Sequence, residues 1–390
     1  MIKMNNIDTL IEQLCPEGVE YKELGKLATI ETGTQLNKTA MAEIGDFPVL
    51  NGGINPSGYY NLYNTEAKTI AISQGGASAG YVNFMKTKFW AGAHCFVVKP
   101  TNSAIDNKFV FYLLKNDQEK LMNAKLGAGI PGLNKKELTT YQIPLPPLPI
   151  QQEIVNILDK FTQLQAELQA ELEVRQKQYE HYRNELLEFE DDEVELKTLG
   201  EVCIVSSGGT PLKAEKSYWT NGTIPWLKSE ACKEKSVFSA NDYITELGLK
   251  KSGAKLLCQS TTLMALVGAT KCKTAFLEFE ATTNQNIAGI RSKNETFLLD
   301  KFIFYYLMNL YKELVKNLGQ YEMLNLGQIR EFKIPIPPLT EQNRIVSILD
   351  QFNKLVNDIT VGLPAEILAR HKQYEFYRGK LLDFKSISNG

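Results

Sequence analysis

Cysteine and histidine are scarce in this chain, and neither is arranged to bind a metal. The sequence has six cysteines and three histidines, and no two cysteines form a Cys-x-x-Cys pair. The histidines are spread singly along the chain, and we interpret His94 as a satisfied core histidine. These absences argue against a zinc site and against a disulfide scaffold.

Long apolar runs are also missing. No segment approaches the roughly 18 apolar residues of a membrane-spanning helix, and the opening MIKMNNIDTLIEQLCPEG lacks the apolar stretch of a signal peptide. The composition, 43% hydrophobic and 23% charged, is typical of a soluble globular protein. We therefore expect a cytoplasmic protein with no membrane partner. The length of 390 residues separately predicts two or more domains.

A net positive charge is absent as well, since the formal net charge is -2. Its distribution along the chain is uneven. Residues 21–140 carry 13 basic against 9 acidic residues and residues 196–333 carry 18 against 13, whereas residues 150–195 carry 4 against 13. Two basic blocks are thus separated by an acidic segment, and any contact with nucleic acid is expected on the basic blocks.

The chain contains a strong internal repeat. YQIPLPPLPIQQEIVNILDKF at 141–161 is answered by FKIPIPPLTEQNRIVSILDQF at 332–352, and RQKQYEHYRNELLEF at 175–189 by RHKQYEFYRGKLLDF at 370–384. The offset grows from 191 to 195 residues, so the second copy has four extra residues. The repeated unit is a basic α/β domain, a Pro-rich junction and a long helix.

Apolar residues recur every three or four positions after each junction, which predicts two amphipathic helices. Thr340 is a plausible N-cap of the second helix, and Gly362 with Pro364 predicts a kink there. Their near-heptad stripes favour packing on each other as an antiparallel coiled coil in a pseudo-twofold molecule. The expected interface and spacer residues are Ile154, Leu158, Phe161, Leu168, Tyr179, Tyr182, Ile345, Leu349, Phe352, Tyr374 and Tyr377. An ordinary buried helix pair and, for PLPPLP, an SH3-type ligand are the alternatives.

These features together resemble the specificity subunits of type I restriction-modification systems. The resemblance rests on the paired IPLPPLPIQQEIVNILD and IPIPPLTEQNRIVSILD junctions and on the paired KQYE-x-YR-x-x-LL helix ends. A weaker element is the run of Gly209 to Pro211, Tyr218, Trp219 and Ile224 to Trp226. The resemblance covers nearly the whole chain and implies two tandem α/β (α+β) target recognition domains with two conserved helices.

The resemblance sets the expected domain limits. They are an N-terminal helical segment at 1–20, recognition domains at 21–143 and 191–334, a central helix at 144–190 and a distal helix at 335–390, kinked near 362–364. Each domain is expected to read one half of a bipartite site in double-stranded DNA. The helices are expected to set the spacing and dock two methyltransferase (M) subunits, with restriction (R) subunits completing a DNA-cleaving complex.

Motifs for catalysis are missing. The nearest approach to an adenine methyltransferase Asn/Asp-Pro-Pro-aromatic loop is Asn55-Pro56-Ser57-Gly58-Tyr59, which lacks the second proline. No Gly-x-x-x-x-Gly-Lys-Ser/Thr loop is present to bind ATP. We therefore expect a non-catalytic chain that binds no cofactor, with S-adenosylmethionine, ATP and Mg²⁺ held by the partner subunits.

The tandem tetrapeptide LQAELQAE at 164–171 looks like the family's spacer-length element. One further copy adds about 6 Å of helix, and B-DNA rises about 3.4 Å per base pair. We expect an insertion to lengthen the gap in the DNA site by about one or two base pairs. A plain solvated helix is the alternative interpretation.

Loops rich in Gly and in amide or hydroxyl side chains are the expected DNA-reading segments, because such side chains contact base edges and phosphates. The first-domain candidates are Thr34, Gln35, Asn37, Lys38, Asn51, Asn55, Ser73, Gln74, Ser78 and Tyr81. The second-domain candidates are Thr210, Lys213, Lys216, Trp226, Lys228, Ser229, Lys271, Lys273, Asn284, Gln285 and Asn286. Gln74 and Gln285 are the favoured pair. Plain turns and, for Trp226, packing within the domain are the competing interpretations.

Three other functions stay open. The first is a specificity subunit of a type IIB-like enzyme, whose partner fuses methyltransferase and nuclease. The others are a tandem scaffold for protein or glycan ligands and a lone nuclease. Salt-sensitive DNA binding disfavours the scaffold, and absence of Mg²⁺-dependent cutting by the isolated chain disfavours the nuclease.

Overall fold

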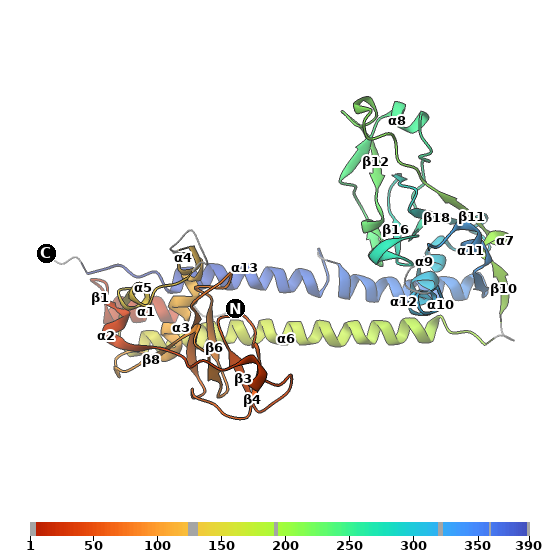
Figure 1. Ribbon diagram of the computed structural model, residues 1–390. Coiled ribbons are helices and arrows are strands. Elements are labelled where there is room, and N and C mark those ends of the chain that lie inside the picture. The colour runs from red at the N-terminus through yellow and green to blue at the C-terminus, as the bar shows by residue number, and fades with distance from the viewer. Residues whose placement is uncertain (1–4, 124–131, 191–193, 319–322, 359, 388–390) are drawn as a thin grey trace. The chain divides into compact units, whose positions relative to one another are not determined.

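The computed structural model describes residues 5–123, 132–190, 194–318, 323–358 and 360–387. The chain divides into two compact units, unit 1 (residues 1–167 and 367–390) and unit 2 (residues 168–366). Each is described by itself, and Figure 1 gives the element labels. The expected domain starts at residues 1 and 191 lie outside the described residues.

Unit 1 is built on a four-stranded sheet of order β2-β8-β5-β6, with a three-stranded sheet β4-β3-β7 and a two-stranded sheet β1-β9. All pairs are antiparallel except β3 with β7. The strands are β1 (Tyr21–Glu23), β2 (Ala28–Thr32), β3 (Phe47–Leu50), β4 (Gly58–Tyr60), β5 (Thr69–Ser73), β6 (Val82–Met85), β7 (Trp90–Ala91), β8 (Cys95–Pro100) and β9 (Gln142–Pro144).

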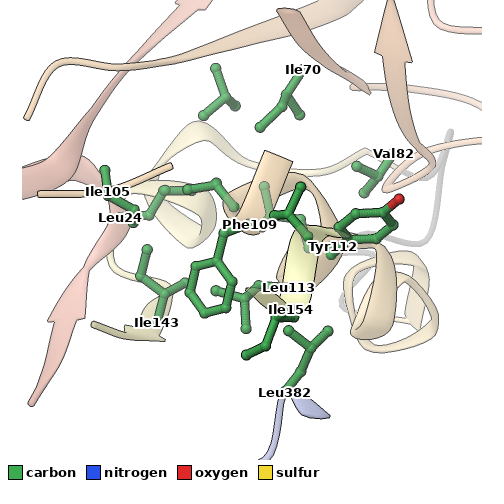
Figure 2. Close-up of a cluster of buried hydrophobic side chains, with 14 of the residues drawn as sticks. Leu24, Ile70, Val82, Ile105, Phe109, Tyr112, Leu113, Ile143, Ile154 and Leu382 are labelled. Carbon is green, nitrogen blue, oxygen red and sulfur yellow. The ribbon is translucent and has the colours of Figure 1, made fainter. Parts of the chain in front are cut away.

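Helices cover the main sheet of unit 1 and close its core. They are α1 (Asn5–Leu14), α2 (Leu24–Leu27), η1 (Lys38–Ala40), α3 (Asn107–Asn116), α4 (Gln118–Asn123) and α5 (Lys135–Thr139). The central helix α3 starts where the Asp106 carboxylate accepts a hydrogen bond from the Phe109 N–H at 2.9 Å. Figure 2 shows Leu113 of α3, Ile154 of α6 and Leu382 gathered in this core.

Unit 2 repeats this topology and extends it. Its sheet has the order β11-β18-β15-β16-β13, with β13 added parallel to β16, and its smaller sheets are β14-β12-β17 and β10-β19. The strands are β10 (Glu195–Thr198), β11 (Cys203–Ser207), β12 (Ile224–Leu227), β13 (Lys235–Val237), β14 (Asp242–Ile244), β15 (Thr262–Ala265), β16 (Thr274–Leu277), β17 (Thr282–Thr283), β18 (Ile287–Ser292) and β19 (Lys333–Ile336). The internal repeat in sequence is therefore a repeat in fold.

The helical elements of unit 2 also follow the order of unit 1. The short ones are α7 (Leu199–Val202), η2 (Lys216–Tyr218), η3 (Ser229–Ala231), α8 (Glu246–Lys250), η4 (Gly268–Thr270) and α11 (Leu326–Glu331). Helix α9 (Asp300–Asn309) packs on β15, β16 and β18 as α3 packs on β5 and β6, and α10 (Tyr311–Leu318) follows it. Phe302, Ile303 and Leu307 of α9 are fully buried in this core.

The long-helix predictions are confirmed in part. The first is the uninterrupted α6 (Leu148–Leu186), whereas the second is two helices, α12 (Leu339–Asn357) and α13 (Leu363–Leu381), which meet beside the expected kink at 362–364. The Thr340 N-cap is wrong, because α12 starts from Pro338, whose carbonyl oxygen accepts from the Glu341 and Gln342 N–H groups.

Each unit contains helix segments from both copies of the repeat. In unit 1, Phe161 of α6 lies against Tyr374 and Tyr377 of α13, and Gln165 lies against His371, so the two helices run antiparallel. In unit 2, Tyr179 and Tyr182 of α6 lie against Phe352 of α12. Most of the expected spacer residues therefore pack within the chain itself, whereas Tyr182 is 42% exposed. Ile154, Leu158, Ile345 and Leu349 are buried, and Leu168 is half-buried.

A buried glutamine anchors each Pro-rich junction. Gln151 accepts from the Asp106 N–H at 2.7 Å and donates to the carbonyl oxygens of Ala104 and Pro146. Gln342 makes the same three bonds, to Leu299, Phe297 and Pro337. Both side chains are fully buried, so these bonds satisfy amide groups that would otherwise be costly to bury.

Within the described ranges, no helix is both long and apolar enough to cross a membrane.

Candidate nucleic-acid interface

Four loops meet in unit 1, which we call a1 (residues 33–38), b1 (51–57), c1 (73–81) and d1 (91–94). The Thr34 N–H donates to the Ala91 carbonyl oxygen at 2.8 Å, which joins a1 to d1. The Ser73 hydroxyl donates to the Gly53 carbonyl oxygen at 3.2 Å, which joins c1 to b1. The Gln74 N–H donates to the His94 carbonyl oxygen at 2.9 Å, which joins c1 to d1. Three segments predicted from sequence therefore form one surface with a fourth.

The equivalent loops of unit 2 meet in the same way. We call them a2 (residues 208–216), b2 (228–230), c2 (265–273) and d2 (283–286). The Gly209 N–H donates to the Thr283 carbonyl oxygen at 2.9 Å, and the Leu266 N–H donates to the Asn286 carbonyl oxygen at 2.9 Å. The Thr270 hydroxyl donates to the Ser229 carbonyl oxygen at 3.2 Å, which joins c2 to b2.

A glycine permits the close approach of loops a and d in each unit. A Cβ atom on Gly33 would lie 2.4 Å from the carbonyl oxygens of Ala91 and Gly92. On Gly208 it would lie 2.0 Å from the carbonyl oxygen of Thr283. Since real Cβ atoms do not approach so closely, both positions require glycine.

Loops c1 and c2 share one backbone conformation. Gly76 and Gly268 have φ of 74° and 76°, and a Cβ atom on either would meet nothing within 4 Å. The Ala79 N–H donates to the Gly76 carbonyl oxygen, as the Lys271 N–H does to that of Gly268. These matches fix a residue-by-residue equivalence between the two loops, with Gly76 equivalent to Gly268.

This equivalence shows that the two favoured glutamines, Gln74 and Gln285, do not occupy equivalent positions in the two domains. Gln74 is equivalent to Leu266, because the N–H of each donates to loop d, at His94 and Asn286 respectively. Gln285 lies instead in d2, where its side-chain oxygen accepts from the Thr210 hydroxyl at 2.6 Å. The two glutamines therefore occupy different loops of the two domains.

Most of the predicted DNA-contacting side chains are accessible. Thr34, Gln35, Asn37, Lys38, Asn55, Lys213, Lys216, Lys228 and Gln285 are exposed. Asn51, Gln74, Ser78, Tyr81, Thr210, Ser229, Lys273 and Asn286 are half-buried.

Four predicted side chains are buried, namely Ser73, Trp226, Lys271 and Asn284. Trp226 donates through its indole N–H to the Gly209 carbonyl oxygen at 3.0 Å, and Asn284 accepts from the Asn286 N–H at 3.1 Å. Ser73 bonds c1 to b1, Trp226 bonds β12 to a2, and Asn284 bonds within d2. Their burial favours a structural role for these side chains, and direct DNA contact through them stays a prediction.

Sequence reasoning missed His94. The interpretation of His94 as a core histidine is wrong, because its side chain is exposed at the end of d1. Its backbone N–H lies 3.4 Å from the Asn51 side-chain oxygen. Its equivalent in unit 2 is Asn286, which was predicted. Aligning the two copies through the d loops would have identified it.

Lysines near these loops differ in their environment. The Asp242 carboxylate, 2.6 Å away, raises the pKa of Lys228. Lys115 lies 4.1 Å from the centre of the Tyr81 ring and donates to the Val82 carbonyl oxygen at 3.1 Å. Burial and the nearby Arg378 lower the pKa of Lys115 to about 8. Tyr81, the last residue of c1, is thereby attached to helix α3.

The described residues offer no grouping of three or more His, Cys, Asp or Glu side chains suited to a metal ion. All six cysteines are free thiols, and burial raises the pKa of Cys95, Cys203 and Cys232 to about 12. These three thiols stay protonated at neutral pH and are poor nucleophiles.

Two equivalent loop surfaces, carried by tandem α/β domains that share long helices, define a two-domain recognition protein. The sequence profile of the type I restriction modification DNA specificity domain matches residues 16–174 and again residues 191–369. The chain belongs to the type I restriction-modification DNA specificity family.

Individual relatives agree. The specificity subunit of the Escherichia coli type I restriction enzyme EcoR124I/EcoR124II is 40% identical over 252 residues, 62% of each chain, so this match spans less than two thirds of that relative. A Haemophilus influenzae protein named as a type I restriction enzyme specificity subunit is 33% identical over 98% of this chain and 100% of its own length.

The fold also matches a solved structure. The crystal structure of a type I restriction-modification system S subunit from M. genitalium superposes with a TM-score of 0.62, covering 94% of this chain and 96% of that one. At 19% identity, this likeness concerns the fold.

Proposed function

We propose that this chain is the sequence-reading subunit of a type I restriction-modification complex, in which each recognition domain reads one half of a bipartite site in double-stranded DNA. One observation carries the proposal. Loops a to d recur in both units with matching backbone hydrogen bonds, and the exposed side chains on them are of the amide, hydroxyl and lysine types that commonly contact DNA.

The helices have a separate role in this proposal. The continuous helix α6, 39 residues long, sets the spacing between the half-sites, and the helical region docks two M subunits, with R subunits joining for cleavage. The Haemophilus influenzae relative, matched over its full length, is named as a specificity subunit, which supports a role in such a complex.

The chain itself transfers no methyl group and cuts no DNA. S-adenosylmethionine, ATP and Mg²⁺ are bound by the partner subunits, and the complex works in the cytoplasm. The sequence supports this, since it has neither a methyltransferase Asn/Asp-Pro-Pro-aromatic loop nor a phosphate-binding loop. Incubating the purified chain with DNA, Mg²⁺ and S-adenosylmethionine should yield neither cleavage nor methylation, and either product would overturn this part.

The experiment that tests the main proposal is single-molecule sequencing of DNA from cells that express this chain with its genomic M subunit. Cells that express the M subunit alone are the control. We expect a methylated-adenine motif of two short halves separated by an unspecified gap, present only with this chain. An undivided motif that does not depend on the chain would contradict the proposal.

A further inference from the structure

The loop surfaces of the two domains differ in charge, although the domains have similar totals. Residues 21–140 sum to +4 and residues 196–333 to +5. Within loops a1 to d1 the only formally charged side chain is Lys38. Loops a2 to d2 carry five lysines, Lys213, Lys216, Lys228, Lys271 and Lys273, against Glu215 and Glu230.

Three of these lysines replace neutral residues at equivalent positions. Lys228 takes the place of Asn51. Lys228 follows Leu227, whose carbonyl oxygen accepts from an N–H of loop d2, and Asn51 follows Leu50, whose carbonyl oxygen accepts from an N–H of loop d1. Lys271 replaces Ala79, and Lys273 replaces Tyr81, as the matching bonds of c1 and c2 establish. The difference is therefore a substitution of charge on a shared backbone.

The remaining pair of lysines lies in loop a2. Lys216 begins η2 as Lys38 begins η1, so this cation is common to both domains, whereas Lys213 is additional. Both Lys213 and Lys216 are exposed, and neither forms an ion pair with any described residue.

The basic residues of unit 1 are largely placed elsewhere. Lys99 pairs with Glu31 at 3.4 Å on the main sheet, Lys108 with Asp159 of α6 at 2.5 Å, and Lys88 with Glu66 at 3.5 Å. These three lysines lie outside loops a1 to d1, so they add no positive charge to that loop surface.

We infer that the second recognition domain is the phosphate anchor of the chain, whereas the first domain reads its half-site mainly through neutral side chains. This inference rests on the proposed function. Contacts between lysines and phosphates supply most of the salt-dependent part of DNA binding, and neutral contacts supply little of it. Lys213 and Lys216 bind phosphates directly, and Lys228 exchanges the Asp242 carboxylate for a phosphate oxygen.

The test measures how DNA affinity depends on salt, with the full chain assembled with its M subunit. The variant Lys213→Gln/Lys216→Gln/Lys228→Gln removes three charges from a2 and b2. A matched variant, Lys197→Gln/Lys293→Gln/Lys333→Gln, removes three charges from unit 2 outside loops a2 to d2. Lys38→Gln removes the single charge of a1. The DNA carries the motif that the wild-type complex methylates.

We expect the slope of log K against log salt concentration to fall in magnitude by about 2 to 3 for the loop variant, because each phosphate contact contributes about 0.9. Lys38→Gln should lower it by at most about 1, and the matched variant should leave it unchanged. An unchanged slope in the loop variant, or an equal loss in the matched variant, overturns the anchor. DNA methylated by the wild-type complex is sequenced in parallel. Absence of the two-part motif in that DNA would show that the proposed function itself is wrong, separately from the result for the anchor.

Discussion

The ring of Phe161 stacks on the ring of Tyr377, with centroids 5.6 Å apart and planes inclined by 27°. In unit 2 the equivalent residues make the reciprocal contact, since the ring centroids of Phe352 and Tyr182 lie 5.5 Å apart. The phenylalanine comes from the start of one helical copy and the tyrosine from the end of the other. Each unit is therefore completed by a segment of the other repeat.

This exchange makes Phe161 a stability determinant of unit 1. Its side chain is 3% exposed, so Phe161→Ala should lower the free energy of unfolding by about 3 to 5 kcal/mol. Phe376→Ala, on the same helix pair but 66% exposed, should change it by less than about 0.5 kcal/mol. Urea unfolding of the full chain measures both, and equal effects of the two variants would argue against the packing described.

Helix α6 provides a prediction about the DNA site. The tandem LQAE at 164–171 lies between Phe161 and Tyr179, which pack in different units. Inserting a third LQAE adds about 6 Å of helix, so the unspecified gap in the methylated motif should grow by about one or two base pairs. Sequencing the methylated motif of the insertion variant measures the gap, and an unchanged gap would rule out a spacer role.

A single inserted alanine after Ala170 is the matched control for that experiment. One residue rotates the rest of the helix by about 100°, whereas four residues rotate it by about 40°. The alanine insertion should therefore rotate Tyr179 by about 100° about the helix axis relative to Phe161 and abolish assembly with the M subunit. Retention of full methylation by the alanine variant would show that the register of α6 is not critical.

Lys115 makes the stability of unit 1 depend on pH. Its folded-state pKa is lowered to about 8, chiefly by burial, whereas an unfolded lysine titrates near about 10.4. Between these values the unfolded chain binds more protons than the folded chain, so the Lys115 contribution to stability rises with pH through this window. The unfolding free energy of wild type relative to Lys115→Met should increase between pH 8 and pH 10. A difference that stays constant over this range would contradict the assignment.

The sequence predicts the parts of this molecule that depend on local spacing. The repeated junctions and apolar stripes predict the duplicated units and their helices, because burial of one helix face imposes a regular period. The buried Gln151 and Gln342 explain why the junction motif recurs, since each bonds the strand-to-helix turn that precedes it.

Features that depend on contacts between distant segments were not predictable in this way. The exposure of His94 and the burial of Ser73 follow from bonds between loops, such as Gln74 to His94. The burial of Trp226 agrees with the competing interpretation of packing within the domain, but its partner Gly209 is not identifiable from spacing. Helix α12 starts from Pro338, whose carbonyl oxygen accepts the first N–H bonds of the helix, and no side chain among the described residues caps that end. The position of Thr340 in the sequence therefore does not reveal where the helix starts.

The division of the DNA site between the two domains is tested most directly by altering one loop surface at a time. Gln35→Ala/Gln74→Ala changes side chains in a1 and c1, and Thr210→Ala/Gln285→Ala changes those in a2 and d2. Single-molecule sequencing of DNA methylated by each assembled complex should show that the first variant relaxes or changes one half of the motif and the second variant the other half. A variant that alters both halves, or two variants that alter the same half or neither, would contradict the claim that each domain reads its own half-site.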